Sequence, residues 1–353
     1  MNLELLCVES DTIPSAIFDS AIVDDDRTLS NLITIEERYL ITGSYFKCLQ
    51  TDLTSSNRCE LATWMLEVCE AENCQCEVFP LSMNILDRFL ALFKIRKSQL
   101  QLLGSVCLFI ASKLIQTRPI SPQKLVYYTD WSIKLEELTD WELLVLSKLK
   151  WDVASVTPND FVGPLLRRLC KYSFVSKNLD RIRKQVLNLI DLCSLDFNFS
   201  MYPPSMIAAA SIVTAAETLL ALTENRYIYK SISSMIVYQL HQMTNIEKEL
   251  LQECHLQIEQ KLLLTMQDKL NQQNQDLNRA SIEKTLIDVC LKENYSESIQ
   301  NHHSHHHTNH HHQPHQHHCL PNHHHLHHVP SHHGTYYQGS CLVANDTSIG
   351  VEY

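Results

Sequence analysis

The sequence Ser98–Leu114 reads SQLQLLGSVCLFIASKL, and it decides the fold class of this protein. Apolar residues occupy most of this stretch, a pattern that is typical of a helix buried on all sides at the centre of a helical domain. Ser98 and Gln101 have the spacing of a capping box, so we expect the helix to begin there. Glycine is scarce, with six in 353 residues, against a usual share of about 7%. The scarcity argues against a turn-rich β-sandwich, and the stretch predicts an all-α protein.

Helical patterns lie on both sides of this central stretch. Before it we expect a short amphipathic helix over Ile35–Leu49, a helix over Arg58–Glu70, and a helix with Pro80 in its first turn. After it we expect a shorter helix that starts at Ser121-Pro122 and another over Leu135–Leu149. Thr157, Pro158 and Asp160 then supply a cap, a first-turn proline and an acidic first turn. Helical patterns follow near 159–170, 177–195, 204–222, 230–241 and 244–268. Two tandem five-helix units of about 100 residues each are therefore predicted.

The composition divides the chain into four regions. Residues 1–30 are acidic and lack periodicity, so we expect a flexible arm. Residues 31–152 hold the first helical unit with its preceding helix, and residues 153–268 hold the second. Residues 269–353 form a low-complexity tail, rich first in Asn and Gln and then in His, with 18 of the 20 histidines after residue 300. A tract of this kind has too little apolar surface to offset its ordering entropy, so disorder is expected there.

Several classes of protein are excluded by missing motifs. The chain has no G-x-G-x-x-G, and the one glycine pair at P-loop spacing, Gly334 and Gly339, is followed by Ser rather than Lys. It has no Gly-x-Ser-x-Gly elbow and no His-Arg-Asp, and only His241 and His255 precede residue 300. A net charge of −11 offers no extended surface for nucleic acid. We therefore expect an interaction protein rather than an enzyme, with no catalytic residue and no cofactor.

Membrane and metal sites are not expected either. The N-terminus lacks the features of a signal peptide, and the apolar tract 206–222 contains polar residues that suit a buried helix better than a membrane span. The cysteine count of 13 is odd, which favours a reducing compartment. Cys69, Cys74 and Cys76 lie close together without a C-x-x-C or a nearby His. The histidine tract has the ligands for zinc or nickel, but its irregular spacing favours an expanded low-complexity repeat.

An ordered series of short motifs covers residues 58–163. They read ATWMLEVCE at Ala62–Glu70, EVFPL at Glu77–Leu81, LDRFL at Leu86–Leu90, LQLLG at Leu100–Gly104, ASK at Ala111–Lys113, YTD at Tyr128–Asp130 and LKW at Leu149–Trp151. This series closely resembles the cyclin box, and among cyclins it resembles the D type. The resemblance is looser over 164–222, where Asn198-Phe199 and Pro203–Met206 are similar to the second box, and it is absent from the tail.

The resemblance implies two stacked five-helix domains that bind and activate a cyclin-dependent kinase without catalysis by this chain. Lys113 and Glu142 match the charged pair that hydrogen-bonds kinase main chain around the kinase's regulatory helix. An ammonium donates to carbonyls and a carboxylate accepts from amides, so such a pair would fix orientation at a mostly apolar contact. Arg58 and Asp87 match a structural pair that joins the first two helices of the box.

A second motif lies outside the box, in the acidic arm. Leu5, Cys7 and Glu9 form an L-x-C-x-E sequence, which resembles the element by which D-type cyclins bind the retinoblastoma pocket protein. In an extended segment, alternate residues lie on one face, as docking along a strand requires. The resemblance therefore implies a retinoblastoma-family partner.

One stretch departs from the family pattern. Cyclins commonly have a Met-Arg-x-Ile-Leu-like segment that forms an apolar groove for substrates and kinase-inhibitor proteins. Here the groove positions are Asn57, Arg58, Glu60, Leu61 and Trp64, and two of them are polar where the family is apolar. A carboxylate without a partner is costly to bury, so we expect peptides of the Arg-x-Leu kind to bind weakly and with marked salt dependence.

Two functions of different class remain. The first is a D-type cyclin that activates its kinase, directs it to the retinoblastoma protein and promotes entry into S phase, in the nucleus and cytoplasm. The alternative is a cyclin-box transcription or adaptor protein that activates no cell-cycle kinase. The L-x-C-x-E sequence favours the first. Neither hypothesis includes a direct nucleic-acid or membrane partner.

Overall fold

The computed structural model describes Asp19 and residues 25–41, 43–221, 226–268 and 270–271. The chain divides into two compact units, residues 1–264 and 265–353, and the helices discussed below belong to the first apart from the end of the last one. Within the described residues all regular secondary structure is helical and no strand is present, which confirms the all-α prediction. Two helical repeats follow one another along the chain, each with its own hydrophobic core.

A short helical segment precedes the first repeat. Its elements are α2 (Asp26–Glu36), a 3-10 turn η1 (Glu37–Tyr39) and α3 (Tyr45–Cys48). The helix expected over 35–49 is therefore wrong, and residues 26–30 belong to α2 rather than to the arm. Asp25 caps α2 by accepting a hydrogen bond from the Arg27 amide at 2.9 Å. Leu29 is buried in the core of the second repeat. This contact with residues far along the chain stabilises a helix that the local sequence does not predict.

The first repeat contains the elements that the sequence motifs predict. They are α4 (Ser55–Ala71), α5 (Val78–Leu92), η2 (Lys97–Gln99), α6 (Leu100–Ile115), α7 (Pro122–Tyr128) and α8 (Leu135–Lys148). The predicted capping box at Ser98 and Gln101 is wrong. Both Ser98 and Gln99 lie in η2, and Gln99 Oε1 accepts from the Arg96 amide at 3.0 Å, so the cap is set two residues earlier.

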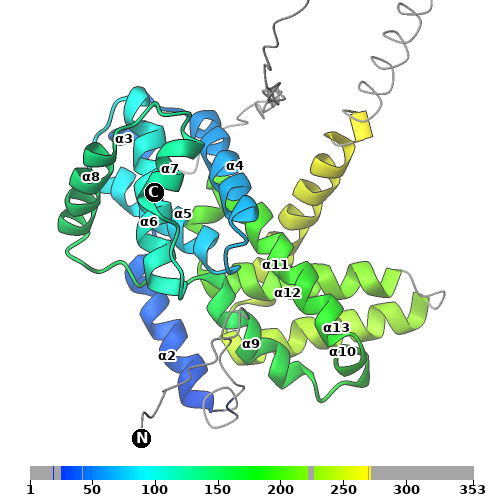
Figure 1. Cartoon of the computed structure of the whole chain (residues 1–353). Helices are drawn as coiled ribbons and strands as arrows, with labels where there is room; N and C mark the ends of the chain where they lie inside the picture. Colours follow the sequence, from blue (N-terminus) through cyan, green and yellow to red (C-terminus); the bar gives the residue numbers. More distant parts are fainter. Residues whose placement is uncertain (1–18, 20–24, 42, 222–225, 269, 272–353) are drawn as a thin grey trace, which may run out of the picture. The chain divides into compact units, whose positions relative to one another are not determined.

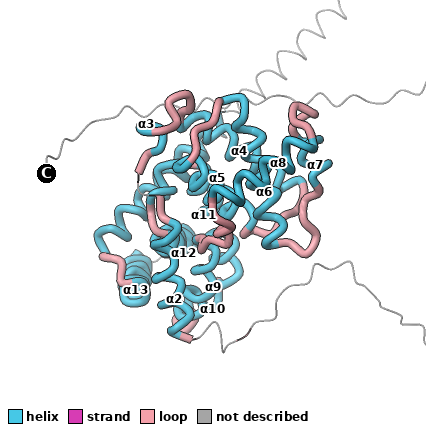
Figure 2. Tube along the Cα trace, turned by 90° about the vertical axis from the view of Figure 1, so that its left-hand side faces the viewer, coloured by secondary structure: helices cyan, strands magenta, loops and turns pink. Residues whose placement is uncertain are grey.

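The second repeat is built in the same way. Its elements are α9 (Pro158–Leu169), α10 (Ser173–Lys177), α11 (Leu179–Leu195), η3 (Phe197–Met201), α12 (Pro204–Ala221), α13 (Arg226–Thr244) and a helix over 248–268. Figure 1 shows α4–α8 gathered in one group and α9–α13 in another. The Cα trace in Figure 2 shows α12 running among the helices of the second group. Repeats of this kind agree with the predicted duplication.

Each repeat is organised around one very apolar helix. The segments Lys97–Ile115 and Pro204–Ala221 are long and apolar enough to cross a membrane by length and composition, yet 67% and 78% of them are buried inside the protein. In α6 the approach of α4 is so close that a Cβ on Gly104 would lie 2.8 Å from Leu61 Cδ1. A larger residue at this position would therefore have to displace the Leu61 side chain. Both segments are core helices, as the polar residues in the second one predicted.

A half-buried carboxyl group, Asp191, lies where α11 packs against α4. Burial, followed by the nearby Glu70, raises the pKa of Asp191 to about 7. The folded protein therefore keeps this proton to a higher pH than the unfolded chain does. As a result, the stability that this group contributes decreases as the pH rises from about 4 to about 7. Asp191→Asn removes the titration. We expect its free energy of unfolding, relative to the natural protein, to rise by on the order of 4 kcal/mol from pH 4 to pH 8.

Urea denaturation at a series of pH values measures this difference. Asp180→Asn, an exposed carboxyl group on the same helix, is the matched control. If both variants show the same pH profile relative to the natural protein, Asp191 is not the group that titrates.

Candidate functional site

The predicted kinase-binding pair, Lys113 and Glu142, meets on the surface of the first repeat. Lys113 lies near the C-terminal end of α6 and Glu142 lies in α8, and these two helices pack together. The Lys113 ammonium donates a hydrogen bond to Glu142 Oε1 and lies 4.1 Å from the centroid of the Phe109 ring. The two side chains are 40% and 16% exposed, so the pair is held in place and remains accessible. Binding of a kinase's main-chain groups by these two charges stays a prediction.

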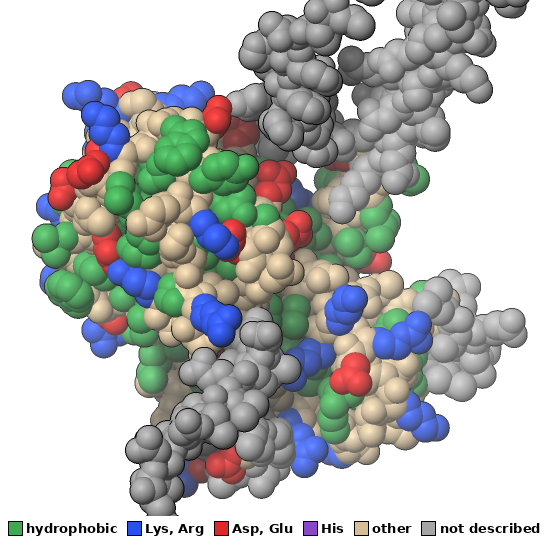
Figure 3. Space-filling model, in the orientation of Figure 1, with side chains coloured by type: hydrophobic (Ala, Val, Ile, Leu, Met, Phe, Trp, Pro, Cys, Tyr) green, Lys and Arg blue, Asp and Glu red, His purple; other side chains and the backbone are tan. Residues whose placement is uncertain are grey.

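Exposed apolar side chains lie next to this pair in the sequence. Leu114 and Leu143 follow Lys113 and Glu142 directly in the sequence, and both are exposed. Figure 3 shows hydrophobic side chains lying between charged ones on the face over α6, α7 and α8. Exposed apolar groups around a fixed charge pair are typical of a protein interface, in which apolar contact supplies affinity and the charges set orientation.

Arg58 and Asp87 lie in the core rather than at a surface. The guanidinium binds the carboxylate in a bidentate way, Nε to Oδ1 at 2.7 Å and Nη2 to Oδ2 at 2.6 Å, and both side chains are 2% exposed. Tyr45 donates a third hydrogen bond to Asp87 Oδ1 at 2.8 Å. Burial works against the charge of Arg58, but Asp87 outweighs burial and raises the pKa of the guanidinium above its ordinary value.

The same arginine also joins the two repeats. Its Nη1 donates to the main-chain oxygens of Ser194 and Leu195, each at 3.1 Å, at the end of α11. Arg58 therefore ties α4, α5 and α11 together, whereas the sequence comparison implied only the first two. Phe197 lies in the first core and its ring centroid is 5.9 Å from the guanidinium carbon, so the junction is closed by apolar contact as well.

The five predicted groove positions have different environments along α4. Arg58 is engaged in the core, and Leu61 is buried against Gly104. Asn57 is the third residue of α4, where its Oδ1 accepts from the Thr54 amide at 3.3 Å in a capping box. Glu60 is exposed and accepts from Ser56 at 3.2 Å. Trp64 is half-buried and donates to the Tyr128 main-chain oxygen at 3.3 Å. Docking of a ligand here stays a prediction that rests on Asn57, Glu60 and Trp64.

The residues predicted to dock the retinoblastoma protein, Leu5, Cys7 and Glu9, lie outside the described residues. The described chain begins its continuous course at Asp25, which caps α2. The role of the L-x-C-x-E sequence stays a prediction.

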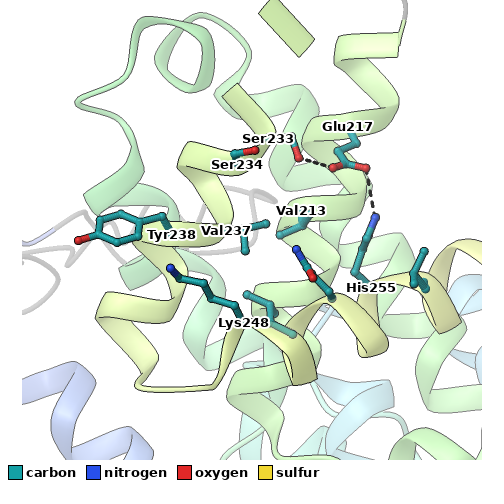
Figure 4. A pocket seen from close by; sticks show the side chains of 11 residues that line it. Val213, Glu217, Ser233, Ser234, Val237, Tyr238, Lys248 and His255 are labelled. Atoms are coloured by element: carbon teal, nitrogen blue, oxygen red, sulfur yellow. Dashed lines mark hydrogen bonds and ion pairs between the residues drawn. The ribbon is translucent and has the colours of Figure 1, made fainter. Parts of the chain in front are cut away.

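The sequence interpretation missed a cavity of about 430 Å³ in the second repeat. It is lined by α12, α13 and the helix over 248–268, and Figure 4 shows the side chains around it. His255 is buried at its edge, with Nδ1 2.9 Å from Thr214 Oγ1 and Nε2 3.2 Å from Glu217 Oε2. Ser233 donates to the other oxygen of Glu217. No sequence motif signals this cavity, because its residues come from helices that are adjacent only after folding.

The polar groups of the cavity satisfy one another. Thr214 Oγ1 donates to the Ala210 main-chain oxygen at 3.0 Å and also lies within hydrogen-bond distance of His255 Nδ1. Glu217 accepts a hydrogen bond from the Ser233 hydroxyl through one oxygen, and its other oxygen lies 3.2 Å from His255 Nε2. The arrangement links α12, α13 and the helix over 248–268 through these contacts. We assign it a structural role.

Comparison with known proteins covers both repeats. The family model described as the cyclin N-terminal domain matches residues 27–154, and the one described as the cyclin C-terminal domain matches residues 156–287. The chain is 47% identical over 283 residues to the G1/S-specific cyclin-D2 of Xenopus laevis, a match that covers 80% of this chain and 95% of that protein. It is 48% identical over 282 residues to the G1/S-specific cyclin-D2 of Gallus gallus, with the same coverage of 80% and 95%.

A solved structure with a similar fold is the X-ray structure of a viral cyclin from herpesvirus saimiri. Its TM-score is 0.55 at 28% sequence identity, and the match covers 67% of this chain and 96% of that chain. The part of this chain that matches therefore corresponds to nearly the whole of that solved structure.

Proposed function

The chain belongs to the cyclin family, in its D-type branch, and from this premise we propose that it activates a cyclin-dependent kinase, directs it to the retinoblastoma protein and promotes entry into S phase. Cyclins of this type are regulatory subunits of cyclin-dependent kinases and are not enzymes themselves. The chemistry is then the kinase's, and this chain supplies binding and orientation. Action in both the nucleus and the cytoplasm is part of the proposal.

The observation that supports the kinase role most directly is the exposed ion pair between α6 and α8. Lys113 and Glu142 neutralise each other in the free chain, and both still reach the surface. A kinase helix that docks on the exposed leucines beside them would bring main-chain carbonyls to the ammonium and amides to the carboxylate. Hydrogen bonds to charged groups are about twice as strong as neutral ones, so the pair would set the orientation of the helix.

The proposal is tested by purifying the complex from cells, identifying the kinase, and assaying it on a fragment of the retinoblastoma protein. We expect a cell-cycle kinase that phosphorylates the fragment only in the presence of this chain. Recovery of transcription factors or transcriptional kinases alone would favour the adaptor function instead.

The L-x-C-x-E sequence supplies a separate prediction. The double substitution Cys7→Gly with Glu9→Lys removes two of the three side chains that face one way in an extended segment. We expect retinoblastoma protein binding to weaken at least about tenfold, since a lost anchor of this kind costs about 1.4 kcal/mol or more. Kinase binding should be unchanged, because Lys113 and Glu142 lie on the folded first repeat.

The measurement is a titration of each complex with a retinoblastoma pocket fragment. The matched control is Ser10→Gly with Asp11→Lys, which makes the same kind of change in the same arm outside the motif. Equal weakening by both variants would assign the effect to the charge of the arm. Loss of kinase binding together with retinoblastoma binding would place the arm in the kinase interface.

Docking of kinase-inhibitor proteins and of Arg-x-Leu substrates is proposed to be weak. Glu60 is exposed and Asn57 is used in the cap of α4, so both present polar groups at positions where an apolar ligand would pack. Selection of substrates would then depend more on the arm than on the groove.

A further inference from the structure

The second repeat has a strongly basic surface. Seven basic residues and a single acidic one, Asp180, occur between positions 167 and 184, in a chain whose net charge is −11. We call the set of basic side chains the basic surface, and its members are Arg167, Arg168, Lys171, Lys177, Arg181, Arg183 and Lys184. They lie at the end of α9, in α10 and at the start of α11. Figure 3 shows Lys and Arg side chains gathered over this part of the second repeat.

The fold brings these charges together because the three helices bury their apolar faces against one another. Leu169, Val175 and Ile182 are buried where α9, α10 and α11 pack, so the basic residues between them remain outside. Lys177, Arg181, Arg183 and Lys184 are exposed, and none has a carboxylate partner among the described residues. A cluster of like charges of this kind repels itself, and a partner of opposite charge relieves the repulsion.

The N-terminal arm meets the fold at this surface. Arg168 Nη2 donates to the Asp25 main-chain oxygen at 3.0 Å and to Asp26 Oδ1 at 3.1 Å. The first residues of α2 are therefore fixed to one edge of the basic surface. The 24 residues that precede Asp25 contain no Lys or Arg, and their carboxylates are Glu4, Glu9, Asp11, Asp19 and Asp24. The arm thus has the opposite charge and is tethered where the basic charge begins.

We infer that residues 1–24 dock on the basic surface of the second repeat of the same chain. At about 3.3 Å per residue the arm is long enough to cover the surface from its attachment point. Because the arm is tethered, the effective concentration of its carboxylates at the basic surface is about millimolar. Ion pairs that are individually weak can therefore form within one molecule. Nucleic acid is a poorer occupant, because a polyanion is repelled by the rest of a chain with a net charge of −11.

The docking has a consequence that rests on the proposed function. Glu9 belongs both to the acidic arm and to the L-x-C-x-E sequence. Binding of the arm to the basic surface would therefore compete with its binding to a retinoblastoma-family protein. The intramolecular contact itself is independent of that partner and is measured without it.

Zero-length carbodiimide cross-linking of the full chain tests the contact, because it joins carboxylates only to lysines in direct contact with them. In low salt we expect cross-links from carboxylates of the arm to Lys177 or Lys184. In 1 M NaCl the screening length is about 3 Å, and we expect at least a fivefold loss of these products. A mixture of isotope-labelled and unlabelled protein should give cross-links within one copy. Cross-links between copies, or to lysines elsewhere, would overturn the inference.

A second measurement follows the mobility of a dye attached to the N-terminus of the full chain. In the triple variant Arg181→Glu, Arg183→Glu, Lys184→Glu we expect its anisotropy in low salt to fall to the value that the natural protein shows in 1 M NaCl. The matched control is Lys94→Glu, Arg96→Glu, Lys97→Glu, which changes three exposed basic residues of the first repeat by the same charge. Circular dichroism verifies that both variants are folded. An equal fall in both variants, or no fall in the first, would overturn the inference.

Discussion

Replacing Lys113 with Glu is expected to weaken kinase binding by about thirtyfold or more. The substitution places a carboxylate beside Glu142 and removes the ammonium that lies over the Phe109 ring. Two like charges would then face the kinase main chain, where the natural pair offers a donor and an acceptor. A changed charge in a hydrogen-bonded interface pair costs about 2–5 kcal/mol, which corresponds to this loss of affinity.

The chain itself should remain folded. The Lys113–Glu142 pair is partly exposed, and breaking such a pair costs about 1 kcal/mol or less. Lys261→Glu is the matched control, because Lys261 forms a comparable pair with Asp196, at 2.9 Å, on the second repeat. The measurement is the dissociation constant for the kinase, together with the thermal midpoint of each variant. Natural affinity in the Lys113→Glu variant would remove Lys113 from the kinase interface.

Replacing Arg58 with Ala is expected to destabilise the fold by about 3–5 kcal/mol. It leaves Asp87 as a buried carboxylate without its cation, and a buried charge without a partner is destabilising by this amount. It also removes the donors to the main-chain oxygens of Ser194 and Leu195 at the end of α11. A loss of this size is a large fraction of the stability of an ordinary domain, so much of the variant should be unfolded at physiological temperature.

The matched control is Arg38→Ala. Arg38 forms an ion pair with Asp152 at 2.8 Å, but its side chain is 69% exposed, so we expect a change of about 1 kcal/mol or less. Asp87→Asn should lie between the two, because Arg58 then keeps its bonds to the two carbonyls of α11. Urea denaturation of the three variants gives the comparison. If Arg58→Ala is no more destabilising than Arg38→Ala, the buried pair does not hold the repeats together.

The helices of both repeats follow from signals that lie within a few residues of one another. Ser121 accepts from the Lys124 amide at 3.3 Å and starts α7 as expected. Asp160 accepts from the Thr157 amide at 2.7 Å and forms the cap of α9. Apolar periodicity, caps and first-turn prolines are properties of single turns of helix, so the sequence reveals them without knowledge of the fold.

The errors at the N-terminus come from contacts between distant residues. The start of α2 was missed because Leu29 is buried by residues of the second core that are distant in the sequence. Glu36 is likewise fixed by Ser205, whose amide donates to it at 2.7 Å. These two residues are 169 positions apart. A polar segment without periodicity is predicted as an arm when the surface that buries its few apolar residues is unknown.

The sequence by itself therefore determined the all-α class, the two tandem repeats and, through its ordered motifs, the cyclin resemblance that identifies Lys113 and Glu142. Tertiary structure decided that these two side chains touch, that Arg58 reaches α11 as well as α5, and that His255 and Glu217 meet at a cavity. The physical reason is the range of the interactions. Helix signals are satisfied by neighbours in the chain, whereas ion pairs and cavities form between helices that are brought together only when their apolar faces are buried.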